Sequence, residues 1–250
     1  MATFKLTIAY DGGPFSGWAV QPGMRTVQGE LEGALELVLG APVSLTVAGR
    51  TDAGVHAWGQ VASFQHDGEV PETLSKALNA NLPGEIAVLS AEAAADGFDA
   101  RRDARSRTYC YWIVNAPVLS PFERGRALHW PGKLDRSALD ACASALVGTH
   151  DFTAFTPTDT AHRRFEREIL AAEWRAFPLG DGRQGDLLEL WVSADAFMRS
   201  MVRTLVGTML EVGNGRRTRE DFAALLDGAH RVRAGDTAPA RGLYLASVAY

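Results

Sequence analysis

The N-terminal segment shows a strand-like hydrophobic pattern, then a loop, and then a helix-like pattern. In TFKLTIAY, apolar side chains recur at every second position from Phe4 to Tyr10, which predicts a strand with one buried face. A glycine-rich loop, DGGPFSGW, follows. Over residues 26–39 apolar positions recur at 3.6-residue spacing with glutamates between them, which predicts an amphipathic helix that ends at Gly40. Strand, loop and helix together form the first half of a split βαβ unit.

Four further elements continue this pattern to about residue 90. We expect short strands near residues 45–48 and 60–64, a helix from about Pro71 to the NANLPG segment, and a strand at 85–90. The predicted order is therefore β-α-β-β-α-β, which is that of the ferredoxin-like fold.

The second half of the chain repeats the pattern with different residues. RTYCYWIV and LLELWVS are predicted strands, and Asp135 is expected to cap a helix that ends at Gly148. A long helix with Phe197 in its apolar stripe, together with Met201, Leu205 and Met209, should follow. Thr218 and Asp221 form a capping-box arrangement at the start of a short helix, and GLYLASVAY is a closing strand.

These elements predict an α+β protein of two ferredoxin-like subdomains with antiparallel sheets. We place the N-terminal subdomain at residues 1–103 and the C-terminal one at 104–250.

Composition supports a folded chain and excludes several classes of protein. With 250 residues and 46% hydrophobic content, the chain can bury a core, and no run approaches the roughly 18 apolar residues of a membrane span. The N-terminus lacks the zones of a signal peptide, so we expect a soluble, cytoplasmic protein. Cys110 and Cys142 are too few for a disulfide scaffold or a thiolate metal site.

The net charge of -5 argues against indiscriminate coating of nucleic acid, because such binding depends on neutralising phosphates. The positive charge is segregated, however. Arginines predominate in 99–107 and again in 199–219, whereas acidic residues gather in 30–36 and 85–96. This distribution is consistent with a basic groove on an acidic body.

The segment AGRTDAGVHAWGQVASF, residues 48–64, is the strongest candidate site. It places Asp52 on a tight loop between two predicted strands, where Gly49 and Gly54 permit close approach of a ligand. Arg50 could reach a bound base or phosphate. An isolated TDAG would usually be an ordinary turn that joins two strands. The whole segment, with an arginine, an aspartate and a glycine turn between two strands, favours a functional site.

This segment resembles the tRNA pseudouridine synthases of the TruA type, in which GRTDAGVHA surrounds the nucleophilic aspartate. The resemblance runs nearly end to end, through YDGGPFSGW, TVQ, ALNANLP, FDARRDARSRTYCY, DFTAF, AFMRSMVRTLVGTMLEVG and GLYLASVAY. One departure is Ala19 and Val20 after Trp18, where the family usually carries glutamine.

The resemblance implies that the chain turns uridine into pseudouridine at positions 38–40 of the tRNA anticodon stem-loop, without a cofactor or a metal. Asp52 would attack the sugar, attack the base or assist elimination, and the sequence leaves these three routes open. The resemblance also implies a central active-site cleft flanked by the two subdomains, and a homodimer that binds tRNA.

Three further catalytic or binding roles follow from motif matches. Tyr109 would stack on the uracil and could act as a base. Arg203 would pair with Asp52 and keep it ionised. Arg50 would support flipping of the target nucleotide. We interpret His56 as a structural hydrogen-bonding residue.

Wider RNA contact is expected from two basic segments that are interleaved with aromatic side chains, a combination that suits stem-loop RNA. These residues are Phe98, Arg101, Arg102 and Arg105, and then His162, Arg163, Arg164 and Arg167.

Two alternatives from other classes have less support in the sequence. Two ferredoxin-like units resemble paired RNA-binding modules without catalysis, but the RNP1 pattern is absent. A metal-dependent hydrolase could use Asp52, His56, His66 and Asp67, but no HExxH or CxxC spacing supports it.

Overall fold

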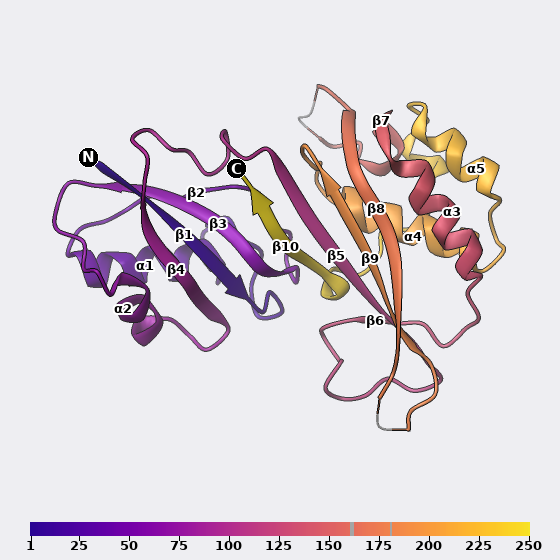
Figure 1. Ribbon diagram of the computed structural model, residues 1–250, viewed down its shortest axis with the longest axis horizontal. Coiled ribbons are helices and arrows are strands. Elements are labelled where there is room, and N and C mark those ends of the chain that lie inside the picture. The colour runs from indigo at the N-terminus through magenta and orange to yellow at the C-terminus, as the bar shows by residue number, and fades with distance from the viewer. Residues whose placement is uncertain (161–162, 181) are drawn as a thin grey trace. The chain divides into compact units, whose positions relative to one another are not determined.

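The computed structural model describes residues 1–160, 163–180 and 182–250 (Figure 1). The protein is α+β, as predicted. It divides into two compact units: unit 1 comprises residues 1–105 and 244–250, and unit 2 comprises 106–243. The last strand thus groups with unit 1. The sequence-based boundaries, 1–103 and 104–250, stay a prediction about folding domains.

Unit 1 has the element order expected of a ferredoxin-like fold. Its strands lie in the order β4-β1-β3, and β2 pairs with β3, all antiparallel. Helices α1 and α2 lie side by side, and α2 also packs along β4 (Figure 1). The elements are β1 (Ala2–Tyr10), α1 (Val27–Leu39), β2 (Thr46–Val47), β3 (His56–His66), α2 (Leu74–Asn81), β4 (Ile86–Ala94) and, from Tyr244 on, β10 (Leu243–Ala249).

The contribution of β10 departs from the predicted antiparallel sheet. This strand pairs with β3 in parallel, with Tyr244 opposite His56 and Leu245 opposite Ala57. The pairing places the C-terminal strand at the beginning of β3, immediately after the candidate loop.

Helix α1 shows how closely local signals can fix an element. The side chain of Thr26 accepts a hydrogen bond from the backbone N–H of Gly29, and Gly40 ends the helix in the left-handed conformation (φ 71°). Leu31 and Leu35 are fully buried on its apolar stripe. The predicted helix and its end are confirmed.

Unit 2 contains an antiparallel sheet in the order β5-β9-β8-β7, with the short β6 parallel to β5. Helix α3 packs against β8 and α4. The elements are β5 (Ser106–Asn115), β6 (Leu128–His129), α3 (Arg136–Leu146), β7 (Gly148–Asp151), η1 (Thr153–Phe155), β8 (Glu166–Pro178), β9 (Asp186–Ala194), α4 (Met201–Gly213), α5 (Arg219–Ala223), η2 (Ala224–Leu226), η3 (Arg231–Arg233) and η4 (Ala240–Gly242).

Several local predictions in unit 2 require correction. The helix expected to end at Gly148 ends at Leu146, and Gly148 is the first residue of β7. Strand β8 was not expected, because its register shifts between Ile169 and Ala171 and interrupts the alternation of buried side chains. Phe197 was expected on the long helix, but α4 begins only at Met201. Phe197 lies in the loop before it.

Among the helices in the described parts of the chain, none is long and apolar enough to cross a membrane.

Candidate active-site loop

The loop of residues 48–55 connects β2 to β3 and carries Asp52 at the start of a tight turn. The backbone N–H of Val55 donates to the carbonyl of Asp52 at 3.1 Å, and Gly54 between them has φ 77°. A positive φ at the third position is what a type II turn requires, and glycine adopts it without strain. Asp52 is partly buried and Arg50 is exposed. The predicted tight loop is present.

The loop after β1, residues 11–18, packs against the backbone beside Asp52. The N–H of Trp18 donates to the carbonyl of Thr51 at 3.1 Å. Gly17 has φ 93°, and a side chain there would begin 2.9 Å from that same carbonyl oxygen. The peptide that precedes Asp52 is therefore held by a neighbour that has no room for a Cβ atom.

His56, at the start of β3, is buried and tied to the same loop. Its Nδ1 lies 3.1 Å from the backbone nitrogen of Gly12 and 3.2 Å from a carboxylate oxygen of Asp11. His56 is buried, and Nδ1 accepts the Gly12 N–H in the tautomer that carries its hydrogen on Nε2. Its ring stacks on that of Tyr244 at 4.7 Å. These contacts agree with the structural role expected of His56.

Tyr109 lies in β5 of unit 2 and is largely covered. Its ring meets that of Phe197 edge-on, with centroids 5.0 Å apart, and only 8% of the residue is exposed. The expected stacking on uracil stays a prediction.

Arg203 lies in the first turn of α4 and is partly buried. Its Nε donates to the carbonyl of Ala238 at 2.8 Å, which fixes one edge of the guanidinium. The preceding Ser200 has φ 58°, a conformation unusual for a residue other than glycine. Arg203 and Asp52 belong to different units, and their expected pairing stays a prediction.

The first basic segment, residues 97–105, is organised by its own carboxylates. Asp99 accepts the backbone N–H groups of Arg101 and Arg102 at 2.8 Å each. The guanidinium of Arg102 binds Asp103 at 3.0 Å and also the carbonyl of Gly97 at 2.8 Å. The side chains of the predicted RNA-contacting arginines, Arg101, Arg102 and Arg105, are exposed, and Phe98 is partly buried against Tyr250.

The second basic segment precedes and enters β8. Arg163 and Arg164 are exposed, whereas His162 lies outside the described residues. Arg167 donates to the carbonyls of Arg164 and Glu166 at 3.0 and 2.6 Å, and burial lowers the pKa of its guanidinium.

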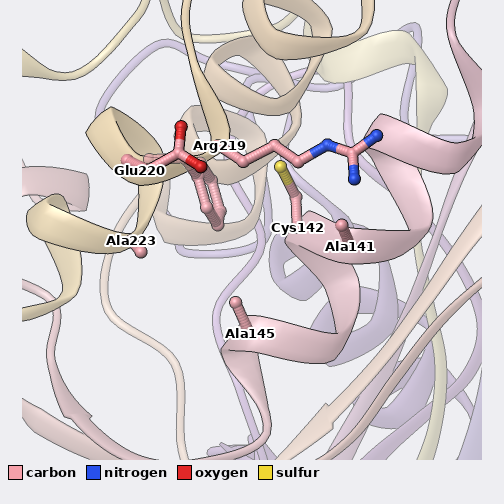
Figure 2. A pocket seen from close by; sticks show the side chains of 7 residues that line it. Ala141, Cys142, Ala145, Arg219, Glu220 and Ala223 are labelled. Atoms are coloured by element: carbon pink, nitrogen blue, oxygen red, sulfur yellow. The ribbon is translucent and has the colours of Figure 1, made fainter.

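A hollow of about 230 Å³ lies away from these residues, between α3 and α5 of unit 2 (Figure 2). Alanines and Cys142 line one wall, and Arg219 extends across the opening (Figure 2). Burial raises the pKa of the Cys142 thiol to about 11, so the thiol stays protonated and weakly nucleophilic at neutral pH. No residue of the candidate site lines this hollow, and we assign it no role in catalysis.

Sequence reasoning missed the polar side chains beneath the Asp52 loop. Tyr10, Thr51 and Gln60 form buried hydrogen bonds with one another and with Gly49. Tyr10 was counted as one apolar position of a strand, and its hydroxyl group was the only signal that it needed a polar partner.

Comparisons with known proteins agree with this arrangement. The family model described as "tRNA pseudouridine synthase" matches residues 6–101 and 142–250. Proteins named tRNA pseudouridine synthase A from Bradyrhizobium sp. (strain BTAi1) and Lacticaseibacillus casei are each 42% identical to the chain, over all of both sequences. The protein of that name from Myxococcus xanthus is 42% identical over all of this chain and 92% of its own length. The chain belongs to the tRNA pseudouridine synthase family.

Proposed function

We propose that this chain isomerises uridine to pseudouridine at positions 38–40 of the tRNA anticodon stem-loop, with Asp52 as the nucleophile. Membership of the family makes it an isomerase. The observation that carries the proposal is the Asp52 turn, which lies within GRTDAGVHA and is closed by the Asp52–Val55 hydrogen bond.

The reaction breaks the bond between N1 of uracil and the ribose and forms a bond from C5 of the same base to the same sugar carbon. The C5 proton is lost and N1 gains one, so the reaction needs neither an oxidant nor a reductant. A carboxylate suits this chemistry because it can form a transient covalent bond and leave again. Asp52 is partly buried, and the turn fixes its backbone.

The other site residues keep the roles expected from the sequence. Tyr109 stacks on the uracil, Arg203 offsets the negative charge of Asp52, and Arg50 holds the flipped nucleotide. Asp52 and Arg203 come together in the active enzyme, where a planar guanidinium can hold a carboxylate through two hydrogen bonds.

Binding of the stem-loop falls to the two exposed basic segments. Phosphate contacts supply most of the affinity of such complexes and make it depend on salt. The exposed side chains of Arg101, Arg105, Arg163 and Arg164 support this assignment. We further propose that the enzyme acts as a homodimer in the cytoplasm.

The test is site mapping of pseudouridine in an unmodified tRNA transcript after incubation with the purified protein. We expect pseudouridine only at those of positions 38, 39 and 40 that carry uridine. A matched transcript with cytidine at all three positions is the control and should remain unmodified. Modification that appears only outside the anticodon arm would contradict the assignment of position.

The metal-dependent alternative gains no specific support. His56 accepts a backbone N–H from Gly12, and Asp67 forms an ion pair with the N-terminal amino group at 3.1 Å. Synthase activity that survives an excess of chelator would exclude the metal-dependent function.

A further inference from the structure

A buried polar cluster, made of Tyr10, Thr51 and Gln60, lies directly beneath the Asp52 loop. We call it the Tyr10 cluster. Its members are 5%, 7% and 0% exposed. They come from β1, from the loop itself and from β3, and Thr51 and Gln60 are 41 and 50 positions from Tyr10 along the chain.

The hydrogen bonds of the cluster link Gly49, Gln60, Tyr10 and Thr51 in one chain. The Gln60 side-chain amide donates to the carbonyl of Gly49 at 2.7 Å and, at 3.4 Å, to the Tyr10 hydroxyl. The Tyr10 hydroxyl lies 2.7 Å from the Thr51 hydroxyl. Either hydroxyl can be the donor of this bond, and the Tyr10 oxygen has a further lone pair that accepts from the Gln60 amide.

Gln60 cannot exchange the ends of its amide without cost. Its side-chain oxygen accepts the backbone N–H of Val61 at 3.1 Å, so both ends of the amide have partners. A buried amide with every group satisfied holds one orientation, since a flip would leave buried polar groups unpaired. Gln60 thereby orients Tyr10.

The strand register changes at the same place. Ile8 lies opposite Gln60, but Tyr10 lies opposite Ala57, so β1 carries an irregularity between Ile8 and Tyr10. Such bulges redirect a side chain away from the regular alternation. Here the irregularity lies beside Tyr10, whose hydroxyl bonds to Thr51 of the loop instead of facing a purely apolar core.

The cluster fixes the backbone on both sides of Arg50. Gln60 donates to the carbonyl of Gly49, and Tyr10 bonds to the side-chain hydroxyl of Thr51. Outside the cluster, the backbone N–H of Trp18 donates to the backbone carbonyl of Thr51. Thr51 immediately precedes Asp52. A shift of Thr51 would move the carboxylate, and a misplacement of about 1 Å can cost roughly 100-fold in rate.

We propose that Tyr10, oriented by Gln60, is a positioning residue that sets the placement of Asp52 through Thr51. This inference rests on the proposed function of Asp52. Burial raises the pKa of Tyr10 to about 12, so its hydroxyl stays protonated throughout the physiological range.

The test compares Tyr10→Phe and Thr51→Val. Each change removes one of the two hydroxyl groups that share this hydrogen bond and keeps the approximate size of the side chain. In single-turnover assays at saturating enzyme, we expect either change to slow pseudouridine formation about 10- to 100-fold. The Kd for tRNA should stay within about 3-fold. The double variant should be no more than about 3-fold slower than the slower single variant, because the bond can be lost only once.

Tyr250→Phe is the matched control. The Tyr250 hydroxyl donates to the carbonyl of Ala100 at 2.8 Å in the same unit, so this change also removes one hydroxyl and keeps the ring. We expect a similar small loss of thermal stability in both tyrosine variants, but a slower chemical step only in Tyr10→Phe.

Wild-type protein without synthase activity would refute the proposed function itself. If the wild type is active, the inference is overturned by Tyr10→Phe at the wild-type rate, by a rate loss in Tyr10→Phe that Thr51→Val does not share, or by rate losses that multiply in the double variant.

Discussion

The Asp52 loop and the arginine segment of residues 97–105 both belong to unit 1, yet they are stabilised in opposite ways. The loop is held from a distance, by Tyr10, Gln60 and the N–H of Trp18. Much of the arginine segment is held locally, because Asp99 accepts two N–H groups from the residues that follow it. The loop's anchors are buried, whereas the arginine side chains project into solvent.

This difference matches what each region must do. A catalytic carboxylate needs a position fixed to a fraction of an ångström, which only packing and hydrogen bonds from the surrounding fold supply. Contacts to phosphates tolerate movement, because long side chains and a diffuse field provide the attraction. Changes to the loop should therefore alter the rate, and changes to the segment should alter the affinity.

The largest effect is expected for Asp52→Asn. The amide keeps the size of the side chain but is not a nucleophile, so pseudouridine formation should fall by at least about 1,000-fold. The Kd for tRNA should change by no more than about 3-fold. Asp67→Asn is the control, because Asp67 is exposed and pairs with the N-terminus. Turnover by a clean Asp52→Asn variant would remove Asp52 from the chemistry, and inactivity of the control would revive the metal alternative.

Arg203→Met should come next, with a loss of about 100-fold in the chemical step. Without the guanidinium, the Asp52 carboxylate would lose the partner proposed to hold its orientation and offset its charge. Arg203→Lys should be intermediate. Arg175→Met, on exposed β8, is the control. An Arg203→Met variant that keeps its rate would leave Arg203 as an RNA contact.

Gly17→Ala tests whether the loop is held from its other side. The new Cβ would lie 2.9 Å from the Thr51 carbonyl oxygen in a residue with φ 93°, and we expect a rate loss of about 10-fold. Gly23→Ala is the matched control. Gly23 also has a positive φ, 73°, but an added Cβ atom would have nothing within 4 Å. Both variants should lose stability, measured by thermal unfolding. Equal rates in the two would show that Gly17 matters only for folding.

The smallest effect on rate is expected in the arginine segment. Replacing both Arg101 and Arg102 by alanine should raise the Kd for tRNA several-fold and lower the salt slope by about 1 for each lost phosphate contact. The rate at saturating enzyme should stay within about 2-fold. Lys76→Ala, on α2, is the control. An unchanged salt slope would exclude these arginines from the RNA footprint.

Local signals predicted much of this fold. The side chains of Asp135 and Thr218 cap α3 and α5 as expected, because a cap depends on residues within one turn. Thr26 caps α1 in the same way. Strand β8 was not predicted, because its irregularity near Ile169 breaks the period-2 pattern of side chains. Phe197 continues a helical stripe in sequence but lies outside α4, since pattern alone does not locate a helix start.

The candidate site divides in the same way. Asp52 was found through the motif that surrounds it, and its turn follows from Gly54. Tyr10 and Gln60 were missed because their contacts with the loop join residues 41 and 11 positions apart, and strand periodicity does not report such pairs. Role assignments for Tyr109 and Arg203 came from resemblance alone.

The most direct test is to map pseudouridine in the anticodon arm of tRNA from cells that lack this protein, complemented with wild-type or Asp52→Asn protein at equal levels. We predict that pseudouridine at positions 38–40 disappears in the deletion, returns with the wild type and does not return with the Asp52→Asn variant. Pseudouridine at these positions in the deletion strain equal to that in the parent, or its full return with the variant, would contradict the account.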